Sequence, residues 1–363
     1  MSDNQGKLIR KIKPWKIIIP IILGVSVVGW LFYDEFDSSV FSKISFSFKV
    51  IFFIAVAFLM MVVRDVGYMI RIKVLSGNQF SWRSVFNINF LWEFTSAITP
   101  SAVGGTTFAV IYVFKEGLSI GKSTALVLAT AFLDEFYFFL MFPLMIILVD
   151  PESLFGLGNG FAGSLNFENQ YFYFAIIGYL IKVVFIISVF YGLFIRPQGL
   201  KQLLLWVFRL RFLKRWRSGV EKTGNDIVES SLILRKEKIG FWIKSFLATF
   251  FSWTARYLVL NFLLLALYAS INPEMIAGLS FSDHLLIFAR QLVMWIMMLV
   301  MPSPGGSGFA EAVFSQYMSD FMPLAFVGVM AFLWRIVTYY PYLIIGAVMV
   351  PKWVARHFAL KNK

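Results

Sequence analysis

The sequence predicts an all-α polytopic membrane protein, and three observations lead to this fold class. Of its 363 residues, 59% are hydrophobic and only 15% are charged, which is more hydrocarbon than the surface of a water-soluble protein carries. Several uninterrupted apolar runs reach the roughly 20 residues that a helix needs to cross a hydrocarbon core of about 30 Å. None of these runs alternates strictly between apolar and polar residues, as the strands of a membrane barrel do.

The composition also removes the ligands of several kinds of catalytic site. The chain has no cysteine and only two histidines, His284 and His357, so thiolate metal sites, His-based metal centres and a Ser/His/Asp triad are not expected. We therefore predict no cofactor, no metal and no catalytic residue, in a protein that is not an enzyme. The net charge of +13 is explained by the loops described next, so nucleic acid is not expected as a partner.

Lysine and arginine are concentrated in segments that would share one side of the membrane. These basic segments are residues 1–19 with five such residues, 71–83 with three, 115–122 with two, 196–244 with twelve and 352–363 with four. The other polar loops carry mainly carboxylates, and they are 34–43, 150–170 and 270–284. Because basic loops face the cytoplasm, we predict a multi-pass protein of the cell (inner) membrane with both termini cytoplasmic.

Six full spans connect the two sides consistently, at 14–33, 44–73, 121–149, 171–195, 241–269 and 324–350. Two more apolar stretches, 84–98 and 285–301, are each followed by a break rich in Pro and Gly and by a short helix, 106–115 or 308–319. A helix of fifteen residues is about 22 Å long, which is less than the hydrocarbon thickness. We therefore expect two re-entrant helical hairpins, each of which enters and leaves by one face.

The two breaks resemble each other, and this similarity predicts an inverted repeat. Residues 99–107 read TPSAVGGTT, and residues 301–308 read MPSPGGSG. Each half contains a long helix, a short helix, the break, a short helix and a long helix with a proline. We therefore predict a single membrane domain covering 1–363, with repeat 1 at 44–149 and repeat 2 at 241–350. The charge pattern orients the two opening helices oppositely, which is the architecture of secondary transporters.

The segment between the repeats, 196–240, is predicted to be a basic cytoplasmic loop. Within it, residues 199–217 mix Leu, Trp and Phe with cations. Such a mixture is typical of an amphipathic helix that lies in the plane of an anionic leaflet.

The breaks are the first candidate binding site, because irregular backbone at membrane depth is tolerated only inside protein or beside a wet cavity. The short helices that follow begin with free N–H groups, which suit a lipid phosphate or carboxylate. The alternative is that the glycines only allow close helix packing. The candidate substrate-binding residues are Pro100, Ser101, Gly104, Gly105, Thr106 and Thr107 in the first break, and Pro302, Ser303, Gly305, Gly306, Ser307 and Gly308 in the second.

Ionisable residues inside the apolar runs are the second set of candidates, because each costs about 2.5–3.5 kcal/mol in hydrocarbon. Arg335 is predicted to pair with Asp134 or Glu135 across the pseudo-twofold axis, and the alternative is a static ion pair that only holds the bundle together. Glu311, after Gly308, is the candidate carboxylate for a substrate amine or a proton. The candidates are Arg64, Glu93, Asp134, Glu135, Arg256, Arg290, Glu311 and Arg335, while Asp65 and Lys182 also lie in apolar runs.

The second break, PSPGGSGFAEAVF at 302–314, resembles the P-x-P-G-G-x-G-x-x-E pattern of the flippase-like transmembrane domain of lysylphosphatidylglycerol synthases. The first break resembles the T-P-x-x-x-G-G pattern of the same family, and the similarity covers residues 10–350. The resemblance implies translocation of a lipid between leaflets in members with a synthase domain, and undefined lipid or glycolipid roles in stand-alone members. The motif residues carried over are Pro100, Gly104, Gly105, Pro302, Gly305, Gly306, Gly308 and Glu311.

Two departures from the family pattern matter for the substrate. No aminoacyl-transferase domain is expected after residue 350, so synthesis of an aminoacyl lipid is not implied. Thr106 stands where many members carry an acidic residue, which leaves the headgroup open.

Together these patterns favour a flippase or scramblase that moves a lipid headgroup through a polar cavity between the repeats. The expected partners are membrane lipids: an anionic or aminoacylated phospholipid, or a polyprenyl-phosphate-linked lipid. One alternative is an accessory membrane partner of a lipid synthase or glycosyltransferase. Another is a membrane-embedded lipid-modifying enzyme, which would need clustered acid, base or metal ligands. Homo-oligomerisation is left open.

Overall fold

The computed structural model describes residues 45–99, 101–155, 170–209, 217–298 and 309–358, and every regular element in this part of the chain is a helix. Five helices are long and apolar enough to cross a membrane: Phe48–Leu75, Ile120–Leu148, Phe172–Ile195, Ile239–Ile271 and Leu324–His357. These helices agree with five of the six predicted spans. The sixth, 14–33, lies outside the described residues.

The helices follow one another in two similar series. The first series is α4 (Phe48–Leu75), α5 (Trp82–Ile98), α6 (Ser101–Lys115) and α7 (Ile120–Leu148). The connecting elements are α8 (Pro151–Phe155), α9 (Gln170–Phe190) with a π-helical turn (Tyr191–Ile195), α10 (Pro197–Val207) and α11 (Arg217–Leu234). The second series is α12 (Ile239–Ile271), α13 (Glu274–Gly278), α14 (Phe281–Met298), α15 (Phe309–Met318), a 3-10 turn (Ser319–Phe321), α16 (Leu324–Thr338) and α17 (Tyr340–Phe358).

Serine caps begin three helices of the first series. Ser47, Ser81 and Ser119 each lie just before a helix in extended conformation and accept a hydrogen bond from a backbone N–H of its first turn. A serine in this position satisfies one of the donors that a helix start leaves unpaired. At the end of α4 the chain turns through Gly77, whose φ of 63° suits a residue without a Cβ.

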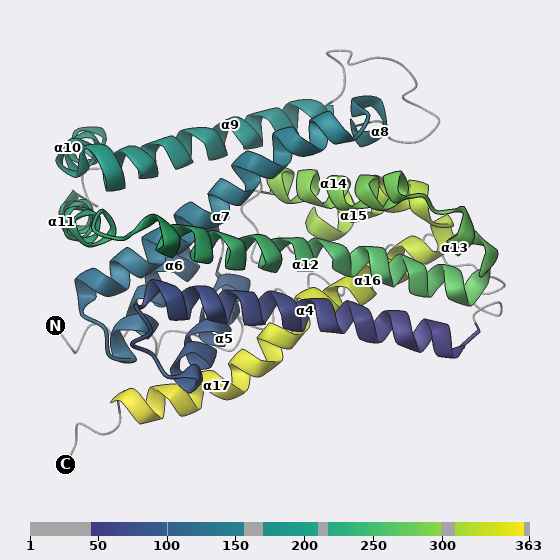
Figure 1. The fold of residues 1–363 in the computed structure, drawn as a ribbon, viewed down its shortest axis with the longest axis horizontal. Coiled ribbons are helices and arrows are strands. Elements are labelled where there is room, and N and C mark those ends of the chain that lie inside the picture. The colour runs from purple at the N-terminus through teal and green to yellow at the C-terminus, as the bar shows by residue number, and fades with distance from the viewer. Residues whose placement is uncertain (1–44, 100, 156–169, 210–216, 299–308, 359–363) are drawn as a thin grey trace.

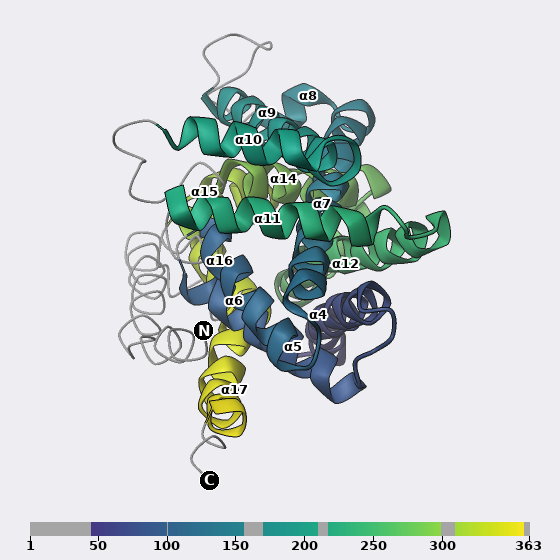
Figure 2. The same ribbon diagram turned by 90° about the vertical axis from the view of Figure 1, so that its left-hand side faces the viewer.

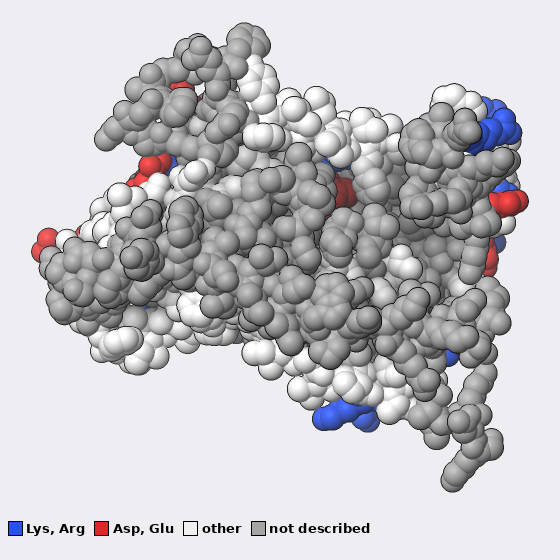
Figure 3. All heavy atoms as spheres, turned by 180° about the vertical axis from the view of Figure 1, so that it is seen from behind, with Lys and Arg blue, Asp and Glu red and all other residues white. Residues whose placement is uncertain are grey.

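The long helices run roughly along one axis of the molecule, and the short ones gather at its two ends (Figure 1). Near one end lie α5, α6, α10 and α11, and near the other lie α8, α13 and the hairpin of α14 and α15. Figure 2 looks at the first end, where α10 and α11 cross in front of the long helices. On the face shown in Figure 3, Asp and Glu side chains are visible at both ends and Lys and Arg side chains at one end and along the lower edge, while residues outside the described part cover much of the middle.

Helices α4 and α12 pack side by side in opposite directions and form the centre of the fold. Ser45, just before α4, exchanges hydrogen bonds with Ser270 near the end of α12. Closer to the middle, a Cβ added to Gly67 of α4 would lie 2.9 Å from the Ala248 carbonyl oxygen and 2.2 Å from the Ser252 Oγ. The glycine therefore allows the two backbones to approach closely, as small residues do in membrane bundles.

We expect Gly67→Val to lower the free energy of unfolding by about 1–3 kcal/mol, because the added side chain must displace the α12 backbone. The measurement is the thermal unfolding midpoint of the purified protein in detergent. Gly240→Val is the matched control, since a Cβ at Gly240 meets nothing within 4 Å. Equal midpoints for the two variants would contradict the close approach.

The first break is narrower than the sequence suggested. Helix α5 ends at Ile98 and α6 already begins at Ser101, so Gly104 and Gly105 lie within a helix and not in a turn. A Cβ on Gly105 would lie 2.2 Å from the Ser96 Oγ of α5, so at this position close helix packing explains the glycine. The second break, 301–308, lies outside the described residues.

Two other helix boundaries differ from the prediction, and one helix was not predicted. The predicted helix at 324–350 consists of α16 and α17, which meet at Tyr339; Pro341 lies in the first turn of α17, where its missing N–H costs no hydrogen bond. The amphipathic helix α10 ends at Val207, earlier than expected, and residues 210–216 lie outside the described part. Helix α11 was not predicted, because it lacks an apolar run.

Candidate functional site

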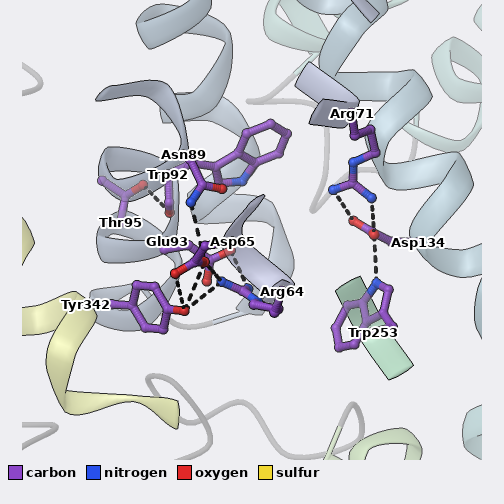
Figure 4. Close-up of polar contacts among 10 residues, drawn as sticks. All are labelled: Arg64, Asp65, Arg71, Asn89, Trp92, Glu93, Thr95, Asp134, Trp253 and Tyr342. Atoms are coloured by element: carbon purple, nitrogen blue, oxygen red, sulfur yellow. Dashed lines mark hydrogen bonds and ion pairs between the residues drawn. The ribbon is translucent and has the colours of Figure 1, made fainter. Parts of the chain in front are cut away.

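A buried arginine on α4 organises the first polar cluster of the bundle (Figure 4). The guanidinium of Arg64 donates from Nη1 to Asp65 Oδ1 at 2.8 Å and from Nη2 to Glu93 Oε1 at 2.6 Å. Tyr342 of α17 lies 3.0 Å from the same Nη1 and donates its hydroxyl to Asp65. Asn89 of α5 also donates to Asp65, at 3.4 Å. This Arg64 cluster therefore joins α4, α5 and α17.

A second ion pair joins α4 to α7 and α12. Arg71 binds both carboxylate oxygens of Asp134, with Nη1 to Oδ1 at 2.5 Å and Nη2 to Oδ2 at 3.3 Å. The indole of Trp253 donates from Nε1 to Asp134 Oδ1 at 2.7 Å, and Arg71 also donates to Thr249 Oγ1 at 3.1 Å. Both oxygens of Asp134 are thus fixed by charge-assisted hydrogen bonds, which are the strong ones in proteins.

The ring of Tyr68 lies between the two arginines of α4. The Cζ atoms of Arg64 and Arg71 are each 4.3 Å from its centroid. Because residues 64, 68 and 71 are spaced by four and three, they lie on one face of the helix. Cation–π contact with this ring supplements the ion pairs of both guanidinium groups.

A third ion pair lies next to the second along α7. Lys182 of α9 donates from Nζ to Glu135 Oε2 at 2.7 Å, and its ammonium is 4.3 Å from the centroid of the Phe138 ring. Asp134 and Glu135 are adjacent residues near the middle of α7. Neighbouring residues point to different sides of a helix, so the two carboxylates have separate partners.

In these ion pairs the cations are buried and the carboxylates are partly exposed. The side chains of Arg64, Arg71 and Lys182 are 2–4% exposed, whereas those of Asp65, Glu93, Asp134 and Glu135 are 14–23% exposed. A carboxylate in contact with hydrocarbon is costly, so accessible carboxylates inside membrane helices face water or a polar ligand. The buried cations hold the carboxylates in place, and the carboxylates are the more exposed members of these pairs.

Arg256, near the middle of α12, lies close to the second pair but has no carboxylate partner in the described part of the chain. Its Cζ is 5.7 Å from the centroid of the Trp253 ring and 5.1 Å from that of Trp295. Since Trp253 also donates to Asp134, one indole connects Arg256 with the Arg71–Asp134 pair.

Arg290 of α14 serves a different part of the molecule. It pairs with Asp320 at 2.7 Å and donates to the backbone oxygens of Tyr317 and Ser153. Ser153 is held in turn by Asp150, which accepts from its backbone N–H and its hydroxyl, and these two hydrogen bonds lower the pKa of the Asp150 carboxyl. Arg290 therefore ties α8, α14 and the end of α15 together.

The predicted pairing of Arg335 with Asp134 or Glu135 is wrong. Arg71 and Lys182 take these two carboxylates, whereas the guanidinium of Arg335 lies over the rings of Trp334 and Tyr339, at 5.1 and 4.7 Å from their centroids. The pairing depends on how each helix is rotated about its axis, which the positions of charges along the chain do not reveal.

Of the other sequence-predicted site residues, Arg64, Glu93, Asp134 and Glu135 lie in the ion pairs described above. Thr106 is half-buried on α6. The remaining candidates lie outside the described residues or have side chains that are not described: Pro100, Ser101, Gly104, Pro302, Ser303, Gly305, Gly306, Ser307, Gly308 and Glu311.

The sequence reasoning missed three residues of the site. Arg71 was assigned to a cytoplasmic loop, but it is buried in α4. Tyr342 and Trp253 were not considered, because aromatic residues in a membrane helix give no signal that separates a hydrogen-bond partner from a lipid contact. Within the described residues, no group of three or more His, Cys, Asp or Glu side chains is placed to hold a metal ion.

Comparison with known proteins identifies the family. A curated relative described as a UPF0104 membrane protein, from Archaeoglobus fulgidus, is 25% identical over 370 residues, which cover 95% of this chain and 99% of the relative. No solved structure matches. Residues 17–346 match the family described as the lysylphosphatidylglycerol synthase TM region. The chain therefore belongs to the lysylphosphatidylglycerol synthase transmembrane-region family.

Proposed function

We propose that this protein moves a lipid, or the headgroup of a lipid-linked molecule, between the two leaflets of the membrane. The observation that carries the proposal is a set of partly exposed carboxylates, Glu93 on α5 and Asp134 and Glu135 near the middle of the membrane helix α7, each held by a buried cation. A headgroup that crosses the bilayer needs a polar path, because burying it in hydrocarbon without partners is costly. The accessible faces of Glu93, Asp134 and Glu135 would form the wall of that path.

Corresponding contacts in the two series of helices support an inverted repeat. Asn89 lies eleven residues before Pro100, and Gln291 lies eleven residues before Pro302. Both are buried amides that donate to the opening helix of their own series, Asn89 to Asp65 and Gln291 to the backbone oxygen of Tyr257 at 2.7 Å. Asp65 and Tyr257 each follow an arginine, Arg64 or Arg256.

The opposite directions of α4 and α12 fit this arrangement, as do the hairpins of α5 with α6 and of α14 with α15 near opposite ends of the molecule (Figure 1). In the proposed topology both hairpins are re-entrant, and the end with α10 and α11 is cytoplasmic. Both termini are then on the cytoplasmic side of the cell membrane. Transport would follow from movement of one repeat against the other.

The family supports lipids as the substrate class, since lysylphosphatidylglycerol is a lipid and the matched region is the membrane part of its synthases. An anionic or aminoacylated phospholipid and a polyprenyl-phosphate-linked lipid both carry a polar headgroup that would need such a path. An accessory role beside a lipid synthase would not require accessible carboxylates inside the membrane.

The test is reconstitution of the purified protein into liposomes that contain trace labelled lipids from these classes, followed by the rate at which each changes leaflet. At least one lipid is expected to move faster than in protein-free vesicles. Glu93→Gln should slow that lipid roughly tenfold, because the charge is lost where the headgroup passes. Glu152→Gln, the same change on the exposed surface of α8, should leave the rate unchanged.

The proposal is refuted if every lipid of the panel moves no faster than in empty vesicles, with and without ion gradients. If a lipid moves equally fast with wild type and with Glu93→Gln, the protein transports that lipid, but its headgroup does not pass Glu93.

A further inference from the structure

Arg256 carries a positive charge in a membrane helix without a hydrogen-bond acceptor in the described part of the chain. Its two aromatic neighbours, Trp253 and Trp295, contact the guanidinium through their rings. None of its nitrogens is among the buried atoms that lack a partner, and the side chain is half-buried. Its N–H groups therefore open onto accessible space.

The position of Arg256 prevents an easy escape to the membrane surface. The residue lies 17 residues after the start of α12 and 15 before its end, or about 25 and 22 Å along the helix. Since α12 is longer than a hydrocarbon core of about 30 Å is thick, the relevant distance is that from the middle of the core to its edge, about 15 Å. An arginine side chain does not extend that far toward the headgroup region. The guanidinium must be satisfied at this depth, by water or by an anion.

Comparison with Arg64 shows what Arg256 lacks. Glu93 lies seven residues before Pro100, and Trp295 lies seven residues before Pro302. In the first series, Glu93 accepts a hydrogen bond from Arg64 at 2.6 Å; in the second, Trp295 offers Arg256 only its ring. The same arginine position thus has a carboxylate in one half and an indole in the other.

An indole in this place leaves the guanidinium ready for an external anion. Cation–π contact uses the ring faces and the positive charge, but it does not use the N–H groups. Arginine has five donors in a planar fork, which matches the oxygens of a phosphate. A carboxylate at position 295 would occupy those donors permanently.

We propose that Arg256 binds the phosphate of the lipid headgroup, between the indoles of Trp253 and Trp295. This assignment rests on the proposed lipid transport and specifies the chemistry of its substrate: a phosphate ester carried by a lipid. Trp253 also donates a hydrogen bond to Asp134, so its indole lies between the proposed phosphate site and the Arg71–Asp134 pair.

The test is equilibrium binding of radiolabelled dihexanoyl phosphatidic acid, which carries a phosphate and no further headgroup, to the purified full-length protein in a non-ionic detergent. Arg256→Gln is expected to weaken binding about tenfold or more, as loss of a charge-assisted contact does. Arg256→Lys keeps the charge but loses the fork, and we expect it to weaken binding less. Arg83→Gln removes an exposed cation at the start of α5 and should change the affinity by less than about twofold.

Two competitors identify the source of the phosphate. Dihexanoylglycerol, the same lipid without phosphate, should fail to displace the label, and inorganic phosphate should displace it only at much higher concentration. Equal affinity of wild type and Arg256→Gln would overturn the assignment, as would equally good competition by dihexanoylglycerol. If inorganic phosphate competes as well as the lipid does, the site binds a free anion and not a lipid, and the assignment is also overturned.

The binding result is separable from the transport result. Phosphate-dependent binding that requires Arg256, in a protein that moves no lipid, would preserve this inference and remove the proposed transport. Lipid movement without such binding would do the reverse.

Discussion

Asp134→Ala is expected to lower the free energy of unfolding by about 3–5 kcal/mol, because it removes the only carboxylate paired with Arg71 among the described residues. The guanidinium of Arg71 is 4% exposed, so water cannot readily replace the lost oxygens. Trp253 loses its acceptor in the same step. The measurement is reversible unfolding of the purified protein in detergent or bicelles, followed by circular dichroism.

The double variant Arg71→Met with Asp134→Leu provides the control. Replacing both members of a buried pair by apolar side chains is often neutral, so the double variant should recover most of the stability that Asp134→Ala loses. If it is stable but moves no lipid, Asp134 has a role in transport beyond holding the bundle together. A single variant within about 1 kcal/mol of wild type would show that the Arg71–Asp134 pair does not stabilise the fold.

The long apolar helices could be predicted because lipid imposes a simple rule on sequence. A span needs about 20 apolar residues, and α4, α7, α9 and α12 each contain such a run. Their ends were placed within a few residues, since charged and polar residues bound the apolar runs. Helix α11 escaped this rule because its polar residues pack at the end of the bundle, where no hydrocarbon selects for apolar side chains.

The partners of the charged residues could not be predicted from positions along the chain. Arg71 lies four residues before the end of α4, so counting charges assigned it to a loop. In the structure it points inward to Asp134, and Lys182 of the next span takes Glu135. Which carboxylate a cation meets depends on helix rotation and packing, and these are properties of the assembled bundle.

The first break illustrates a limit of motif reading. Paired glycines suggested an irregular turn, yet α6 begins at Ser101 and includes both. Gly105 is needed where α6 approaches Ser96 of α5, so the motif encodes close packing at this position. Glycine permits both unusual backbone angles and close contact, and sequence alone does not separate these two uses.

Arg64→Met is expected to lower the free energy of unfolding by about 3–5 kcal/mol. The substitution removes the guanidinium that binds Asp65, Glu93 and Tyr342, and it leaves two carboxylates close together without their cation. Reversible unfolding of the variant in detergent, followed by circular dichroism, measures the loss.

The stability of Arg256→Met is the comparison for that of Arg64→Met. The two arginines occupy corresponding places in the proposed repeats, but within the described residues only Arg64 has carboxylate partners. An arginine whose hydrogen-bond acceptor belongs to the fold contributes to stability, whereas one whose acceptor is a ligand contributes to binding and costs stability when the ligand is absent. Arg256→Met should therefore unfold at the same temperature as wild type or higher in lipid-poor detergent. A loss of stability equal to that of Arg64→Met would mean that Arg256 is a structural residue, and its assignment to a lipid phosphate would have to be abandoned.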